Sequence, residues 1–326
     1  MTSRETIIAN IEHSADDRIG FNFAGVRGRR NDFASAGCEH GIEIKKWTEG
    51  GFEFYTDIWG NIWKRIIGKS ESGEVHEAAL EDWSDLDSFE LPDLANPRHF
   101  ESARALGGGD NERFRCGHFW GIGWIFTIPE SLRRMDTYLM DMIAYPSEVA
   151  VLHDRIAELL EGIIEQYGEA GLDGIMFGED LGLQDRLILG KSRWNEVFRP
   201  YYERLTAKAH TYGMKVIQHT CGFNWELIDD LCDSGIDCLQ FDQPCVYDLP
   251  ALAAKLTQHR VGLFSPCDIQ TVLPTGDRKA IESHCRQTVE LFRGGFIAKN
   301  YPDLLGIGVT DEWDEWAYRT FEGLGA

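Results

Sequence analysis

The stretch Lys215-Val-Ile-Gln-His-Thr-Cys-Gly222 is the most informative part of this sequence. A short apolar run ends there in a histidine and a cysteine two positions apart, followed by a glycine. Residues two positions apart in a β-strand point to the same side, so His219 and Cys221 are predicted to leave the strand end together. An imidazole and a thiolate are ligands that Zn²⁺ prefers. The stretch therefore predicts a buried strand and part of a metal site.

The same kind of unit recurs through the second half of the chain. Each time, a helical pattern is followed by a turn of small residues, a short apolar run and a polar cluster. Strands and helices that alternate in this way are typical of parallel βαβ units. The apolar runs are residues 174–178, 215–219, 237–241, 261–265 and 295–298, and the helix candidates are residues 148–168, 192–211, 224–233, 248–257 and 278–292.

A parallel sheet of this kind is either doubly wound or closed into a barrel. No Gly-x-Gly-x-x-Gly pattern follows an early strand, which disfavours a doubly wound dinucleotide-binding domain. The polar clusters follow successive strands, where (β/α)₈ barrels build their active sites. We therefore predict an α/β protein with one domain over residues 1–326, a single (β/α)₈ TIM barrel. Residues 1–110 are expected to form an irregular N-terminal cap and the first elements, with a hairpin at 55–65, and residues 111–326 the main βα repeats.

Composition disfavours several classes of function. The chain has 32 Lys and Arg against 54 Asp and Glu, a net charge of −22, which argues against binding to nucleic acid or an anionic membrane. It contains no apolar run of about 18 residues and no apolar leader after Met1, so we expect a cytoplasmic protein without a membrane span. The eight cysteines include no Cys-x-x-Cys pair, and most are expected to be buried thiols.

Other predicted strand ends offer further metal ligands. His219 and Cys221 are the central pair, and Cys267 or Glu179, which follow two other apolar runs, could complete three or four ligands. A catalytic zinc keeps one coordination position open for the substrate. The alternative is a polar barrel mouth with buried thiols and a hydrogen-bonded histidine.

Two further groups of residues are candidates for catalysis and substrate binding. Glu179 and Asp180 are the candidate catalytic residues, since one could ligate metal or act as an acid while the other orients a ligand; the alternative is that they cap the next helix. The aromatic run at 118–126 could wall a flat apolar substrate, or could belong to the core. Its candidate substrate-binding residues are Trp120, Trp124 and Phe126.

Several segments together resemble a known superfamily. They extend over most of the chain and are Asp16-Asp17-Arg18, Tyr55–Arg65, Phe177-Gly-Glu-Asp-Leu-Gly-Leu-Gln184, Trp194–Pro200, the His-x-Cys-Gly strand, and Asp268-Ile-Gln270 with Leu273-Pro-Thr-Gly276. In these segments the sequence resembles the uroporphyrinogen decarboxylase superfamily of (β/α)₈ barrels, and specifically its corrinoid-dependent methyltransferases.

The resemblance implies a ligand set and a reaction. In the zinc methyltransferases of the superfamily, the His and Cys of this motif bind the metal with a cysteine near the last strand. Asn300 stands in that region here, so Cys267 is our candidate for the third ligand, Glu179 for the fourth, and Asn300 for a substrate contact. The implied cofactors are Zn²⁺ and a cobalamin carried by a separate corrinoid protein. The expected substrate is a small methyl donor, such as the methoxylated aromatics of O-demethylase systems.

Two other functions are alternatives to the methyltransferase, and one assembly state is expected. One is a metal-free decarboxylase or lyase, but Arg27, Arg29 and Arg30 do not reproduce the arginine-rich N-terminal motif that the decarboxylase uses to hold its carboxylates. The other is a non-catalytic barrel that has lost its third ligand, which Asn300 favours. A homodimer is the default expectation for a soluble oligomer.

Overall fold

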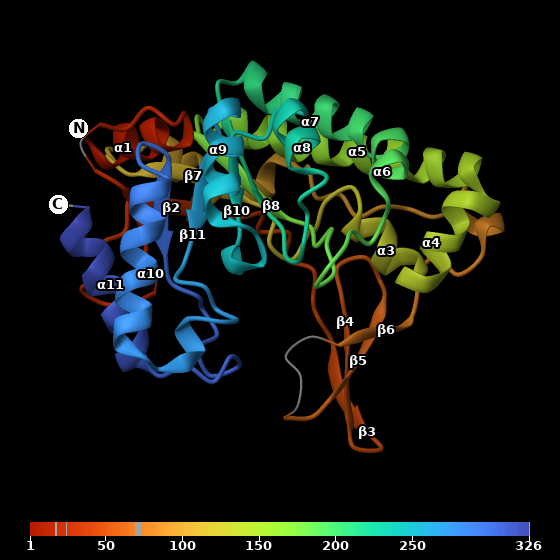
Figure 1. The fold of residues 1–326 in the computed structure, drawn as a ribbon. Helices are drawn as coiled ribbons and strands as arrows, with labels where there is room; N and C mark the ends of the chain where they lie inside the picture. The colour runs from red at the N-terminus through yellow and green to blue at the C-terminus, as the bar shows by residue number, and fades with distance from the viewer. Residues whose placement is uncertain (17, 24, 69–72, 326) are drawn as a thin grey trace.

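The computed structural model describes residues 1–16, 18–23, 25–68 and 73–325 of the chain. Asp17, part of the first resembling segment, lies outside the described residues. Within them, the strands form two sheets, one with eight strands and one with four (Figure 1). The larger sheet is the body of the molecule, and the smaller one projects from it as an arm.

The larger sheet is a nearly closed parallel barrel. Its strand order is β1-β12-β11-β10-β9-β8-β7-β2, and every ladder between neighbours is parallel. At the open edge, an isolated antiparallel bridge joins Asn22 of β1 to Asn31, which precedes β2. The predicted (β/α)₈ fold is confirmed. The strands are β1 (Gly20–Asn22), β2 (Phe33–Ala36), β7 (Phe114–His118), β8 (Gly174–Gly178), β9 (Lys215–His219), β10 (Cys238–Gln240), β11 (Gly262–Ser265) and β12 (Phe296–Lys299).

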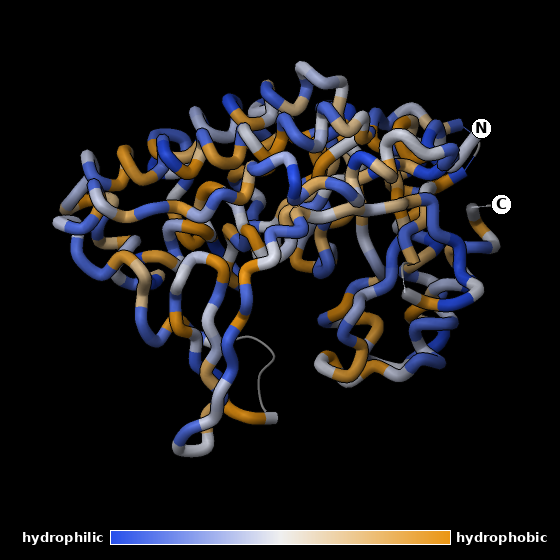
Figure 2. The backbone as a smooth tube through the Cα atoms, turned by 180° about the vertical axis from the view of Figure 1, so that it is seen from behind, coloured by the Kyte–Doolittle hydropathy of each residue, from blue (hydrophilic) through white to orange (hydrophobic). Residues whose placement is uncertain are grey.

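Helices form the outer layer. Figure 2 shows hydrophobic and hydrophilic residues alternating along them, as expected of helices that turn one side to the barrel. None of the described helices has both the length and the hydrophobicity needed to cross a lipid bilayer. The helices are α1 (Ser3–Ile11), α2 (Glu101–Gly108), α3 (Thr127–Arg133), α4 (Met135–Ala144), α5 (Pro146–Glu169), α6 (Lys191–Val197), α7 (Arg199–Thr211), α8 (Ile228–Asp233), α9 (Leu249–His259), α10 (Arg278–Leu291) and α11 (Asp311–Leu324), with 3₁₀ turns at Trp83–Asp85, Pro97–Phe100, Pro244–Val246 and Leu273–Thr275.

One predicted helix is two helices. The pattern at 192–211 divides into α6 and α7 at Phe198, whose backbone lies at φ −108° and ψ −35°. Pro200 stands in the first turn of α7. Proline is well suited to a first turn, because it has no N–H to donate there, but it disfavours continuation of a helix that precedes it.

The arm is an antiparallel sheet of β3 (Lys46–Glu49), β4 (Phe52–Thr56), β5 (Ile62–Ile66) and β6 (Glu74–Glu77). The predicted hairpin is confirmed, since β4 and β5 pair from Phe52 with Ile66 to Thr56 with Ile62. Its loop is held by the Asp57 carboxylate, which accepts from the backbone N–H groups of Trp59 and Asn61. Besides the arm, the first 110 residues supply β1 and β2 of the barrel.

Candidate metal and substrate site

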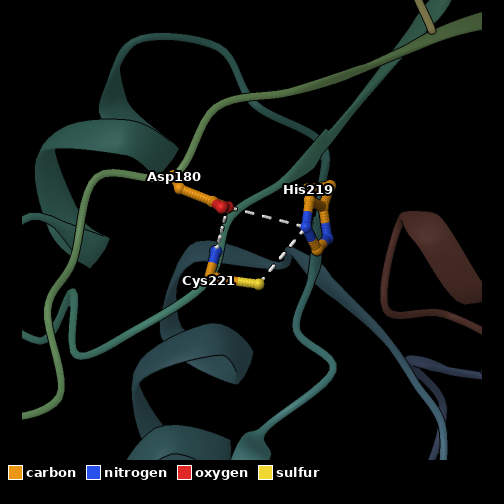
Figure 3. A group of neighbouring side chains, drawn as sticks. All are labelled: Asp180, His219 and Cys221. Atoms are coloured by element: carbon orange, nitrogen blue, oxygen red, sulfur yellow. Dashed lines mark hydrogen bonds and ion pairs between the residues drawn. The ribbon is translucent and has the colours of Figure 1, made fainter. Parts of the chain in front are cut away.

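Asp180, His219 and Cys221 lie together at the carboxyl ends of β8 and β9, with their side chains turned toward one another (Figure 3). The two strands are neighbours, and their register places Gly178 opposite His219. The oxygen, nitrogen and sulfur atoms that could bind a metal all lie within 4.8 Å of one another. His219 Nε2 is 3.4 Å from Cys221 Sγ and 3.7 Å from an Asp180 carboxylate oxygen. We call these three residues the metal group.

The loop after β9 is shaped by Gly222. Its φ of +78° is one that side chains with a Cβ rarely adopt, and a Cβ there would lie 2.2 Å from the Gly182 carbonyl oxygen. The close approach brings the loops after β8 and β9 together. The backbone N–H of Cys221 then donates to Asp180 at 2.9 Å. The glycine of the His-x-Cys-Gly motif is therefore part of what assembles the metal group.

A chain of side chains on β10 and β12 orients the His219 ring. The Gln240 amide oxygen lies 2.6 Å from His219 Nδ1, while its Nε2 donates to Asp242 at 2.8 Å. Lys299 Nζ donates to the same Asp242 oxygen at 2.7 Å. Because an amide oxygen can only accept, His219 carries its proton on Nδ1. The other ring nitrogen, Nε2, faces Cys221 and Asp180.

The metal group fits a zinc ion. A carboxylate, an unprotonated imidazole nitrogen and a thiolate are all zinc ligands. The other nitrogen of a metal-bound histidine usually donates a hydrogen bond to an acceptor such as the Gln240 amide oxygen. Burial, and then the carboxylates of Asp180 and Asp242, hold the pKa of Cys221 above its usual value. A bound cation would reverse this effect, because it favours the thiolate. Three protein ligands would leave one position for a substrate.

Glu179, a predicted metal ligand, lies apart from the metal group in the structure. Its buried carboxylate accepts from the backbone N–H groups of Phe126 and Thr127 and, at 2.5 Å, from the Tyr202 hydroxyl. Burial raises the pKa of Glu179 to about 7. Among the described residues it does not join the grouped ligand atoms. Glu179 instead anchors the start of α3, and it is the neighbouring Asp180 that lies with His219 and Cys221.

Cys267 also lies apart from the metal group. Cys267 is 1% exposed, and its thiol interacts with that of Cys285 in α10. The thiol is therefore directed at the contact between the end of β11 and the outer helix. In the described part of the chain, its sulfur is not among the atoms gathered with His219 and Cys221. The structure brings together Asp180, not Cys267, as the third candidate ligand.

A cavity of about 510 Å³, here called the mouth pocket, opens beside His219. Its predicted substrate contacts include Trp120, whose ring meets the His219 ring edge-on at a centroid distance of 6.2 Å, and Asn300. Trp120 is 49% exposed. The cavity combines apolar walls with a few polar side chains, as small-molecule sites do. Its lining residues include Trp120, Phe264, Asp242, Lys299, Asn300 and Tyr301.

The other two aromatic candidates lie in the core. Trp124 is fully buried and stacks on Phe177 with centroids 4.0 Å apart. Phe126 is buried against Phe198 and contacts Tyr138. The chain turns into α3 after Trp120, so the later aromatics of the run pack inward. Of the three aromatic candidates, Trp120 alone is exposed at the mouth.

The N-terminal arginines are used elsewhere in the fold. Arg29 pairs with Asp314 and Glu315 of α11, and the Arg30 guanidinium lies over Phe21, 4.7 Å from its centroid. Among the described residues that line the mouth pocket, Lys299 is the single Lys or Arg, and it is paired with Asp242. The pocket therefore lacks the cluster of cations that a substrate with several carboxylates needs.

Gln240, Asp242 and Lys299 were not among the sequence-predicted site residues. Gln240 and Asp242 did carry a usable pattern, because they lie two positions apart at the end of an apolar run. The ladder between β9 and β10 pairs Gln240 with His219, and only that register shows why the glutamine matters. Lys299 sits at the last strand end without a pattern that distinguishes it from any surface lysine.

Comparisons with known proteins agree with this architecture. The family model described as uroporphyrinogen decarboxylase (URO-D) matches residues 69–309. A methyltransferase from Methanosarcina mazei has a similar fold, with a TM-score of 0.62 at 14% identity over 79% of this chain and 74% of that one. A D-psicose 3-epimerase matches at a TM-score of 0.41 and 12% identity over 75% of this chain and 88% of that one. Comparison with curated proteins found no match. The family match covers most of the chain, and the protein belongs to the uroporphyrinogen decarboxylase family.

Proposed function

We propose that this protein is a zinc-dependent methyltransferase that removes the methyl group of a small donor and passes it to a corrinoid on a separate protein. The observation that carries the proposal is the metal group of Asp180, His219 and Cys221 beside the mouth pocket. The fold it shares with the Methanosarcina mazei methyltransferase accords with this reading. Membership of the family supports an enzyme more than a non-catalytic barrel.

The roles of the side chains follow from their positions. Zinc held by the metal group would supply Lewis acidity at the donor's methylated heteroatom. Gln240 fixes the His219 ring so that its Nε2 faces the ligand position. Lys299 neutralises Asp242, the carboxylate behind Gln240, and so keeps that chain of hydrogen bonds in place. Trp120 contacts the His219 ring edge-on and forms an aromatic wall beside it.

The mouth pocket favours a small donor over a large carboxylated one. Trp120 and Phe264 offer aromatic walls, as a methoxylated aromatic donor would require. A substrate with many carboxylates would meet one lysine, which is already paired, and the unpaired carboxylates would be desolvated at a high cost. This is the physical reason to prefer methyl transfer to the metal-free decarboxylase reaction.

The first test is the metal content of the purified protein and of single-residue variants. We expect about one zinc per chain, lost or strongly reduced in Cys221→Ala, His219→Ala and Asp180→Ala. Cys267→Ala is the matched control, because it removes a buried thiol outside the metal group. Zinc retained in Cys221→Ala, or lost in Cys267→Ala alone, would contradict the proposed ligand set.

Methyl transfer itself is tested with the zinc-loaded protein, a corrinoid protein and a panel of methylated donors. We expect a change in the corrinoid absorption spectrum that needs both donor and zinc, and none with Cys221→Ala. Turnover of a carboxylated substrate after chelation of the metal, with no corrinoid present, would instead establish the decarboxylase or lyase function.

A further inference from the structure

A second cavity, of about 380 Å³, lies between the arm and the barrel and is called here the arm pocket. Residues from the β4–β5 hairpin form one side of it. The loop after β7 and helix α3 form the other. Its aromatic and acidic lining residues are Tyr55, Trp59, Trp63, Phe119 and Trp120, with Asp57 and Glu130.

The aromatic side chains are held in place. Tyr55 and Trp63 face each other across the β4–β5 ladder, with ring centroids 6.1 Å apart and planes within 9°. The indole N–H of Trp63 donates to Asp57 at 2.7 Å, and that of Trp59 donates to the Ile122 carbonyl at 3.1 Å. The N–H groups of Trp59 and Trp63 are thus bonded to the protein, and the Arg65 guanidinium lies over the Tyr55 ring, 5.5 Å from its centroid.

The charged side chains of the arm pocket are all acidic. Asp57 accepts hydrogen bonds from Asn61 and Trp63 within the hairpin, so its carboxylate is fixed beside the rings. Glu130 is different, because its carboxyl group has no hydrogen bond or ion pair with any described residue. No Lys, Arg or His is among the described residues that line the pocket. Burial, and secondarily Asp180, raises the pKa of Glu130 to about 7.

This combination suits an organic cation. The faces of Trp and Tyr rings attract cations, and quaternary ammonium groups are commonly recognised by several such rings together. A half-buried carboxylate with no partner is costly unless a ligand supplies the opposite charge. An uncharged aromatic ligand would fill the same volume but would leave Glu130 unpaired. The net charge of −22 also raises the local concentration of cations around the protein.

We propose that the arm pocket binds a methylated ammonium group, with Tyr55, Trp63 and Trp120 as its walls and Glu130 as its counter-ion. The arm pocket shares Trp120, Thr127, Glu130 and Gly178 with the adjoining cavity that reaches Asp180 and His219. A ligand anchored by its cationic end therefore extends toward the metal group. Resting on the proposed function, this makes the methyl donor a small molecule with a permanent positive charge at one end.

Calorimetric titration with choline and with 3,3-dimethyl-1-butanol, its uncharged carbon isostere, tests the charge requirement directly. The protein is used both zinc-loaded and after chelation, with no corrinoid present. We expect choline to bind about tenfold more tightly than the isostere, which corresponds to about 1.4 kcal/mol. Tetramethylammonium should compete with choline. Equal affinity for choline and the isostere, or no binding of either cation at millimolar concentration, overturns the proposal.

Variants test the assigned residues. Glu130→Gln preserves the size of the side chain and removes its charge, and Trp63→Leu removes one ring; each should weaken choline binding about fivefold to tenfold. Trp47→Leu, an exposed tryptophan of the arm outside the arm pocket, should bind as the wild type does. Unchanged affinity in both pocket variants overturns the assignment. Choline binding needs no metal, so it can persist when the zinc test fails, and the two proposals fail separately.

Discussion

At the scale of single residues, the orientation of His219 depends on a side chain from the neighbouring strand. Gln240 accepts from Nδ1 and thereby presents Nε2 to Cys221 and Asp180. Gln240 is in turn held by Asp242 and Lys299. The zinc affinity proposed for the metal group would therefore depend on residues that, within that group, contact only His219.

Gln240→Leu should weaken zinc binding about tenfold to a hundredfold, because the His219 ring loses the acceptor that fixes its tautomer. The measurement is competition for zinc with a chelator of known affinity. Gln184→Ala, at an exposed glutamine, is the control and should leave the affinity unchanged. An unchanged affinity in Gln240→Leu would show that the hydrogen bond does not orient the metal ligand.

The sequence predicted some of these residues and could not predict others. His219 is the last residue of β9 and follows from strand periodicity. Cys221 lies beyond the strand, and the loop at Gly222 keeps its sulfur beside His219, where the period of two had predicted it. Glu179 and Asp180 come after β8, where the direction of each side chain depends on the loop and no longer on the period of two. The position of the Glu179 carboxylate is therefore known only from its contacts with Phe126 and Tyr202 in the structure.

At the scale of elements, the loops after β8 and β9 determine the metal group more than the strands do. The strands were predictable, since buried apolar runs of four or five residues between turns have few alternatives. The break between α6 and α7 and the strands β1 and β2 were not recognised. β1 and β2 are only three and four residues long, too short for a hydrophobic pattern to distinguish them from loop.

Gly222→Ala tests the loop after β9. The substitution places a Cβ at positive φ and against the Gly182 carbonyl, so it should lower the free energy of unfolding by about 2 kcal/mol or more and displace Cys221. Urea denaturation measures the first effect and zinc content the second. Gly190→Ala is the control, because its φ is −59° and a Cβ there meets no atom within 4 Å. Equal stability of the two variants would contradict this account.

At the scale of the whole molecule, a buried histidine couples the stability of the helical layer to pH. His153 of α5 is 1% exposed and lies 2.5 Å from the Tyr138 hydroxyl of α4. Burial lowers the pKa of His153 from 6.5 to about 3. Between these values the unfolded chain binds a proton that the folded protein does not. The stability contributed by neutral His153 is therefore present above pH 6.5 and is lost as the pH falls toward 3.

Below pH 6.5, we expect the burial of neutral His153 to lower the free energy of unfolding by up to about 1.4 kcal/mol for each unit that the pH falls. Denaturation curves between pH 7 and pH 4 should show a shallower decline for His153→Gln than for the wild type, even though the variant is less stable at pH 7. His76→Asn, at an exposed histidine of the arm, should keep the slope of the wild type. Identical slopes in His153→Gln and the wild type would exclude this source of acid sensitivity.

The pairing of β1 with β12 has a consequence for synthesis. These strands come from opposite ends of the chain, so a nascent polypeptide cannot complete the barrel until its last strand has left the ribosome. β8 and β9, by contrast, are adjacent in sequence and in the sheet. Asp180, His219 and Cys221 can thus gather while the barrel is still open, so a metal ion held by them would be able to enter before the final strand closes it.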